Sequence, residues 1–246
     1  TAVDVFVYRT ADDSDGGAWR KRTQGTSWYN ETLNTATRGS RKEFPSVAVI
    51  VAESNQVTIY DGDDPDMPMW MVFNNNSNCM IGNTGAIEAT AMLNGELCVV
   101  RTSASKGLGQ ISFLTEVGKT IRRASSGYLY IYKGNIEQRN DALEYANQND
   151  ITQSIAGDHI YAVAMTVFAN APIDVASGLP TVTIAVSTDN GISVLKDNGT
   201  VIDIGYANYE TSTNIYFNSK NHLIFSQNNS GTQRMVKVYY DIPSSD

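Results

Sequence analysis

The sequence predicts an all-β protein, a β-propeller of about five four-stranded blades, with a β-sandwich as the alternative. Residues 181–204 contain three short apolar runs separated by two Asp-Asn-Gly triplets, at 189–191 and 197–199. Asn-Gly favours two-residue hairpin turns of type I′, in which both central residues need positive φ. The pattern recurs along the chain at intervals of about 40–50 residues, a spacing typical of propeller blades. We expect residues 1–246 to form one propeller domain.

Three further segments match this meander, and together with it they give the blades in chain order. The matching segments are 48–60, 96–114 and 222–240. Strand-like runs that precede the copies lie at 87–92, 160–168 and 214–217, and runs that follow the first three lie at 69–73, 120–121 and 200–204. Four strands joined by three turns make one blade.

The interval between the segment 96–114 and the meander at 181–204 is about twice the other intervals between copies. We expect a degenerate blade there. Residues 128–132 supply one clear strand, whereas 136–149 carry no alternation and suggest a short helix or an excursion. The last copy offers three strands, at 213–218, 222–227 and 233–240. The isolated N-terminal run 3–8 is therefore expected to complete the last blade and to close the ring.

Side-chain size along residues 182–187 indicates stacked sheets. Val182, Ile184 and Val186 share one face, and the small residues between them share the other, because strands alternate faces with period two. A large face and a small face suit a blade between two others. A sandwich strand with a small-residue outer face is the alternative.

Composition excludes several classes of function. The net charge is −8, which disfavours binding to a nucleic-acid backbone, and no apolar run approaches the roughly 18 residues of a membrane span. Cys98 lies inside an apolar run, and we expect a buried free thiol there, with Cys79 as the only other cysteine. The chain starts at Thr1 rather than Met, so we expect either a removed N-terminal segment or a piece of a longer protein.

An acidic cluster between two expected strands is the candidate metal site. Asp61, Asp63, Asp64 and Asp66 could bind Ca²⁺, which is the one cofactor that the sequence suggests. The loop lacks the bidentate Glu of an EF-hand, since position 72 is Val72. A polar loop between strands is the alternative.

The irregular stretch before residue 45 is the candidate binding surface. Residues 20–42 hold six basic side chains against the single acid Glu31. This pattern suggests either a solvated loop or a docking surface for an acidic neighbour. Aromatic residues beside arginine suit stacking on sugars or anchoring an interface, or else they fix the loop to the body. The candidate partner- or glycan-binding residues are Trp19, Arg20, Trp28, Tyr29, Arg38 and Arg41, whereas we expect Trp70 in the core.

No catalytic motif is recognisable. The chain has no Gly-x-Ser-x-Gly elbow, P-loop or Gly-x-Gly-x-x-Gly, and its two histidines, His159 and His222, lack a second ligand at metal spacing. A glycosidase needs two placed carboxylates, and no pair stands out among the many acids. We therefore expect a non-enzymatic protein.

Several segments together resemble an uncharacterised family of tail- or fibre-type virion proteins of marine tailed bacteriophages. The segments that carry this resemblance are 13–23, 26–30, 35–41, 58–65, 69–73, 171–174 and 236–243. The resemblance implies a virion or extracellular location and supplies no catalytic residues. Family members are often longer than this chain.

These observations predict a structural or adhesive module of a phage tail, nozzle or fibre. It would contact neighbouring virion proteins or a host surface glycan, and it would be assembled in an oligomer. The alternative is a secreted or virion-associated polysaccharide-degrading enzyme on the same scaffold.

Overall fold

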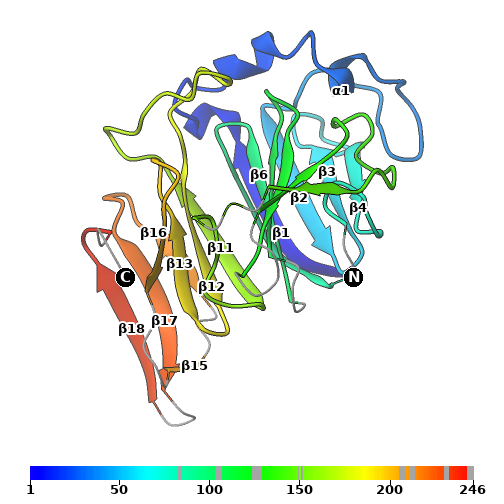
Figure 1. Ribbon diagram of the computed structural model, residues 1–246. Coiled ribbons are helices and arrows are strands. Elements are labelled where there is room, and N and C mark those ends of the chain that lie inside the picture. Colours follow the sequence, from blue (N-terminus) through cyan, green and yellow to red (C-terminus); the bar gives the residue numbers. More distant parts are fainter. Residues whose placement is uncertain are drawn as a thin grey trace.

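A computed structural model describes residues 1–82, 85–102, 107–123, 129–148, 150, 152–204, 209–210, 214–229 and 233–242. Over these residues the protein is all-β, as predicted, and its strands form four antiparallel sheets, none of which closes into a barrel (Figure 1). We name the sheets A, B, C and D in chain order.

Sheet A contains the N-terminal strand. Its strands, in spatial order, are β1 (Ala2–Arg9), β2 (Val47–Glu53), β3 (Gln56–Asp61) and β4 (Met69–Asn74). The prediction that the N-terminal strand completes the last blade is wrong, because β1 pairs with β2, with Val5 opposite Val51. Tyr8 and Phe6 of β1 pack in the same core as Ile50 of β2, and this shared burial decides the partner.

Sheet B is larger than a blade. Its strands are β5 (Ile87–Leu93), β6 (Glu96–Arg101), β7 (Leu108–Ser112), β8 (Gly118–Ile121), β9 (Leu129–Tyr132) and β10 (Tyr145–Asn147). The segment expected to form a degenerate blade instead supplies β9 and β10, which extend this sheet. No helix forms in the described part of 136–149, which holds a turn and β10. The Tyr132 hydroxyl fastens that turn, lying 2.7 Å from the carbonyl oxygen of Asp141.

Sheet C is the predicted meander. Its strands are β11 (Ile160–Thr166), β12 (Thr183–Thr188), β13 (Gly191–Leu195) and β14 (Val201–Ile204). Every residue of β12 is buried. Val182, Ile184 and Val186 enter the core shared with sheet B, and Ala185 enters the core shared with sheet D. The prediction of a sheet sandwiched between two others is therefore confirmed.

The turns of this meander are not of the predicted type I′. Only the glycines have positive φ, 117° at Gly191 and 84° at Gly199. The Thr188 side chain organises the first turn, accepting a hydrogen bond from the Asn190 N–H at 3.0 Å. A turn with positive φ at both central residues lies between β5 and β6, at Asn94 (52°) and Gly95 (71°).

Sheet D contains β15 (Tyr209–Glu210), β16 (Ile215–Phe217), β17 (Leu223–Asn229) and β18 (Gln233–Tyr239). The central strand β17 pairs with β18 along one edge and with β15 and β16 along the other. The three strands predicted at this end of the chain are confirmed.

The four sheets pack face to face in chain order, with an apolar core between each pair of neighbours. The first strands of sheets A, B and C lie side by side, because β1 contacts β5 and β5 contacts β11, and β11 in turn contacts β16 of sheet D. Residues of all four of these strands line one groove of about 330 Å³.

Residues 10–46 form a cap over one end of sheets A and B (Figure 1). The cap contains the short helices η1 (Thr10–Asp12), η2 (Ala18–Arg22) and α1 (Ser27–Asn30). Trp19, Trp28 and Phe44 of the cap are fully buried and join the core between sheets A and B. Cys79 and Cys98 are both buried and free, which confirms the expected thiol at Cys98.

Candidate functional site

The two tryptophans predicted as exposed binding residues are buried, so that prediction is wrong. Trp19 Nε1 donates to Asp13 Oδ2 at 2.7 Å, and Trp28 Nε1 donates to the Phe113 carbonyl at 2.9 Å. Trp28 also packs edge-on against Trp70, which lies in the core as expected. The alternative, in which these aromatics fix the loop to the body, is confirmed, because indole rings with a satisfied N–H stabilise a core.

Arg38 is an internal residue, not part of a docking surface. Its side chain is 1% exposed and forms an ion pair of 2.7 Å with Glu31, which Arg139 also pairs at 2.6 Å. The Arg38 guanidinium lies 4.4 Å from the centre of the Trp70 ring. Burial lowers the pKa of Arg38 to about 10, and it stays charged at neutral pH. This triad ties the cap to sheet A and to the turn at 136–140.

The other predicted binding residues lie at or near the surface. Arg20 donates to the Phe44 carbonyl at 3.0 Å, and the half-buried Tyr29 donates to Glu43 at 3.2 Å. Arg41 forms ion pairs with Asp61 at 2.9 Å and with Asp63 at 2.7 Å. The structure therefore brings Arg41 to the acidic cluster and not to the tryptophans.

The acidic cluster is partly occupied by the protein's own donors. Besides Arg41, Asp63 accepts hydrogen bonds from the backbone N–H groups of Ser46 and Val47, at 2.8 and 2.9 Å. Asp64 accepts from the backbone N–H of Asp66 at 2.9 Å. Within the ranges that the structure describes, no three or more His, Cys, Asp or Glu side chains gather into a potential metal site. Calcium binding stays a prediction.

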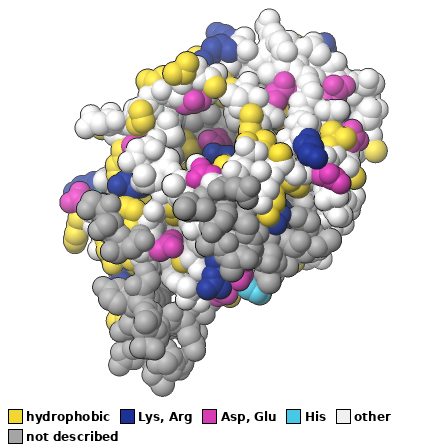
Figure 2. All heavy atoms as spheres, viewed as in Figure 1, with side chains coloured by type: hydrophobic (Ala, Val, Ile, Leu, Met, Phe, Trp, Pro, Cys, Tyr) yellow, Lys and Arg dark blue, Asp and Glu magenta, His cyan; other side chains and the backbone are white. Residues whose placement is uncertain are grey.

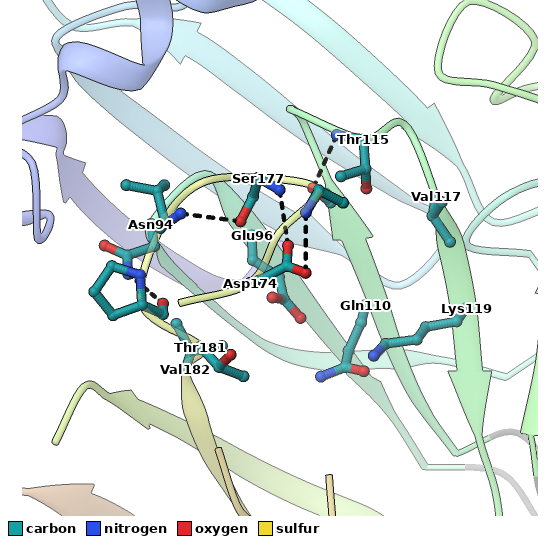
Figure 3. A pocket seen from close by; sticks show the side chains of 14 residues that line it. Asn94, Glu96, Gln110, Thr115, Val117, Lys119, Asp174, Ser177, Thr181 and Val182 are labelled. Atoms are coloured by element: carbon teal, nitrogen blue, oxygen red, sulfur yellow. Dashed lines mark hydrogen bonds between the residues drawn. The ribbon is translucent and has the colours of Figure 1, made fainter. Parts of the chain in front are cut away.

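A cleft of about 360 Å³ lies between sheet B and the loop 167–182 that leads into sheet C, and its walls are mostly apolar with several polar side chains. Figure 3 shows side chains from both parts directed into it. Lining residues with polar side chains include Asn94, Glu96, Gln110, Lys119, Asp174 and Thr181. A smaller cavity of about 170 Å³ shares Glu96, Gln110 and Lys119 with the cleft, so the two lie side by side. Acidic and basic side chains are visible inside a hollow on the face shown in Figure 2.

Strand register places the polar groups of sheet B on one face. Cys98 lies opposite Gln110, which lies opposite Lys119, and Glu96 lies opposite Ser112. Paired residues point to the same side of a sheet, and this side carries the core shared with sheet C, including Cys98 itself. The face therefore changes from apolar to polar toward the Asn94 turn, and the cleft opens at that change.

The loop that forms the other wall is held by hydrogen bonds within it and to distant segments. Asp174 Oδ2 accepts a hydrogen bond from the Ser177 N–H at 2.9 Å, and Gly178 turns the chain at φ 69°. Two residues from distant segments fasten the loop: Arg22 donates to the Ser177 carbonyl at 2.7 Å, and Asn94 donates to the Pro180 carbonyl at 2.9 Å. The cap, through Arg22, and the turn at Asn94-Gly95 thus position Asp174.

The two carboxyl groups of the cleft have opposite electrostatic environments. Burial raises the pKa of Glu96, and nearby Asp174 raises it further, against an opposing effect of Lys119. Hydrogen bonds from Ser177 lower the pKa of Asp174. At neutral pH Asp174 is therefore the more firmly ionised of the two groups.

Gln110 gives independent support for a ligand. The residue is 4% exposed, and its Oε1 atom has no hydrogen-bond partner among the described residues. A buried amide oxygen without a partner costs roughly 1–3 kcal/mol, and a donor on a bound molecule would remove this cost. The cleft volume lies within the range of roughly 300–1,000 Å³ seen for small-molecule sites. The arrangement suits a polar ligand with several hydroxyl groups.

Sequence reasoning missed this cleft, although two signals point toward it. Asn94-Gly95 is the strongest short hairpin signal, and it fixes the register of β5 and β6. The segment 171–174 contributed to the family resemblance, but only the fold brings Asp174 to sheet B.

Comparisons with known proteins do not assign this chain to a family. A scan against protein-family models gave no match, and a search of curated proteins gave none either. Among the residues that the structure describes, no helix has the length and hydropathy needed to cross a membrane.

Proposed function

We propose that this protein is a non-catalytic structural and adhesion module of a phage virion, belonging to a tail, nozzle or fibre. In this proposal its loops contact neighbouring virion proteins, and the cleft between sheet B and the loop 167–182 binds a host surface glycan. The sequence resemblance supports the virion assignment, and the cleft supports the glycan assignment.

The scaffold in this proposal is a β-propeller whose blades are built around sheets A to D. Three features support it: the sheets follow one another in chain order, strands β1, β5, β11 and β16 contact in series, and these four strands line a common groove. A propeller has the same radial order, with the first strand of each blade at the axis. Such a scaffold displays loops rigidly.

The observation that carries the glycan proposal is the unpartnered Oε1 of Gln110 within a cleft lined by Glu96, Lys119 and Asp174. Sugars present hydroxyl groups that both donate and accept hydrogen bonds, so carboxylates, an ammonium and an amide can bind them together. No aromatic side chain lines the cleft. Recognition would therefore depend on hydrogen bonds and not on ring stacking.

The test is binding of the purified protein to an array of bacterial surface oligosaccharides, followed by calorimetric titration of each hit. We expect Lys119→Ala and Gln110→Ala each to weaken binding about 10-fold or more, which corresponds to about 1.4 kcal/mol. Lys21→Ala is the matched control, because Lys21 is exposed and does not line the cleft. Binding that is unchanged in both cleft variants would refute the glycan proposal.

A second candidate function is hydrolysis of a surface polysaccharide in the same cleft. The observation that favours it is that the pKa of Glu96 is raised whereas the pKa of Asp174 is lowered. Glycosidases combine a carboxylic acid that keeps its proton with an ionised carboxylate. In this reading Glu96 protonates the leaving oxygen, and Asp174 activates water or attacks the sugar. Release of reducing ends from polysaccharide, abolished in Glu96→Gln but kept in Glu137→Gln, would establish the enzyme. Binding without release supports the module.

A further inference from the structure

The smaller cavity beside the cleft has a lining of its own, although it shares Glu96, Gln110 and Lys119 with the cleft. Most of its other residues belong to sheet C and to the hairpin that joins β13 to β14. Its volume of about 170 Å³ lies below the range of roughly 300–1,000 Å³ that is usual for a small-molecule site. The cavity therefore suits an extension of the neighbouring cleft better than an independent site.

Strand register gives this cavity one polar wall and one apolar wall. On sheet B, Gln110 lies opposite Lys119, and Figure 3 shows both side chains in the lining of the cleft. On sheet C, Ile184 lies opposite Leu195, which lies opposite Val201, and this row faces the core shared with sheet B. A sugar unit is two-sided in the same way, because its ring carries C–H groups and its rim carries hydroxyl groups that donate and accept hydrogen bonds. The cavity can therefore hold one sugar unit between two unlike walls.

The second Asp-Asn-Gly turn, at 197–199, contributes to the wall formed by sheet C. Lys196, Asp197 and Gly199 line the cavity. Backbone hydrogen bonds hold the turn: the Gly199 N–H donates to the Lys196 carbonyl at 2.9 Å, and the Lys196 N–H donates to the Thr200 carbonyl at 2.8 Å. The side chains of Lys196 and Asp197 are therefore not needed to hold the turn.

The charged and amide side chains around the cavity are free of protein partners. Within the ranges that the structure describes, the side chains of Gln153, Lys196 and Asp197 make no hydrogen bond and no ion pair, and all three are half-buried. The same is true of Glu96 and Lys119, where the cavity meets the cleft. Half-buried polar groups normally have partners, so these five are available to a bound molecule.

We propose that the smaller cavity is a second subsite of the glycan cleft, so that the protein binds at least two consecutive sugar units of a chain. One part of the chain occupies the cleft, and the next unit occupies the smaller cavity. The residues shared by the two, Glu96, Gln110 and Lys119, contact the linkage between the units. The inference rests on the proposed function, and it names an oligosaccharide chain, not a single sugar, as the class of ligand.

The test measures affinity against chain length by calorimetric titration. The probes are the mono-, di- and tetrasaccharide obtained by partial hydrolysis of the polysaccharide from which the tightest array hit derives. We expect the tetrasaccharide to bind at least about 10-fold more tightly than the monosaccharide, because only the longer probe reaches both cavities.

Two variants alter the second subsite alone, since neither residue lines the cleft: Val201→Phe fills the cavity, and Gln153→Ala removes a polar group. We expect Val201→Phe to weaken tetrasaccharide binding about 10-fold or more and Gln153→Ala about 5-fold, with monosaccharide binding unchanged in both. Val236→Phe and Gln24→Ala are the matched controls, because both residues are exposed and line neither cavity. The controls should bind every probe like the unmodified protein.

Methyl NMR of the unmodified protein gives a readout that needs no variant. Leu195 and Val201 line the smaller cavity only, so their methyl signals should shift with the tetrasaccharide and stay in place with the monosaccharide. Val117 lines the cleft only, and its signals should shift with both probes. Thermal melts establish that each variant is folded. If Val201→Phe unfolds, Gln153→Ala and the methyl shifts decide the outcome.

Failure of this inference is distinguishable from failure of the proposed function. If no probe of any length binds, the glycan proposal fails and the second subsite fails with it. Equal affinity for all three probes would overturn the second subsite and leave the cleft as a site for one sugar. Weakening by Gln153→Ala that is the same for the monosaccharide and the tetrasaccharide, or absent for both, would overturn it too.

Discussion

The carboxylate of Asp63 offers the sharpest test of how the cap is held to sheet A. Asp63 accepts hydrogen bonds from the Ser46 and Val47 N–H groups and an ion pair from Arg41, and the Ser46 hydroxyl is also bonded to it. Burial by itself would raise the pKa of Asp63. The Ser46 hydroxyl and N–H, Arg41 and Val47 together outweigh burial and hold the pKa well below its usual range. The perturbation is Asp63→Asn, which keeps the shape and removes the charge.

The expected loss is worked from these contacts. Hydrogen bonds to a charged group contribute about 1.5–3 kcal/mol each. The Asp63 side chain is 25% exposed, so solvent screening reduces the sum, and asparagine retains one acceptor oxygen. We expect a loss of about 2–3 kcal/mol at pH 7. For a chain of this size that loss lowers Tm by about 4–12 °C.

The pH dependence has a defined sign. A carboxyl group with a lowered folded-state pKa adds stability above its unfolded pKa, about 3.9 for aspartate, and loses that stability as pH falls through the folded value. The Tm difference between Asp63→Asn and the unmodified protein should therefore be constant from about pH 5 to 7 and should narrow below about pH 4. Differential scanning calorimetry across this range measures it.

Asp66→Asn is the control, because Asp66 belongs to the same acidic cluster but lies outside the contacts of Asp63. Its Tm should match that of the unmodified protein. A loss of unfolding free energy below about 0.5 kcal/mol for Asp63→Asn at pH 7 would refute this reasoning, and so would a Tm difference from the unmodified protein that widens on acidification. The same variants test calcium: the calcium prediction requires a Ca²⁺-dependent rise in Tm that Asp66→Asn diminishes.

Two further predictions follow from burial. Trp28→Ala should lower the free energy of unfolding by about 3–5 kcal/mol in a denaturant titration, because Trp28 is fully buried. Tyr29→Ala should lower it by only about 1 kcal/mol, because Tyr29 is half-buried. Equal losses for the two variants would contradict the packing. Burial raises the pKa of Cys98 well above its ordinary value, so a thiol reagent should modify Cys98 only on the timescale of unfolding. Rapid labelling of Cys98 in the native protein, read by mass spectrometry, would contradict the structure.

Local patterns were predictable because their causes are local. The meander of sheet C follows from the alternation of residues 182–187 and from turn residues at 189–191 and 197–199, and these features act within a few residues of each other. The three C-terminal strands and the buried thiol of Cys98 were predictable for the same reason. The type I′ turn was assigned to the wrong Asn-Gly pair, because the Thr188 side chain offers its turn another set of hydrogen bonds.

The candidate site was not predictable, because its parts are far apart in the sequence. Trp19 and Trp28 looked like binding residues beside arginine, but Asp13 and the Phe113 carbonyl satisfy their N–H groups inside the core. The cleft joins Glu96 and Lys119 on sheet B to Asp174 on a loop, and their proximity depends on strand register and on two remote hydrogen bonds, from Arg22 and Asn94.

The sequence by itself therefore determined an all-β protein with readable hairpins and one sheet buried on both faces. Only the tertiary structure decided which strand accompanies β1, how β9 and β10 extend sheet B, and which polar side chains share a cleft. The physical reason is that hydrophobic alternation specifies that a strand has a buried face, but not which face of which sheet covers it. That choice depends on packing between residues that the chain separates by tens of positions.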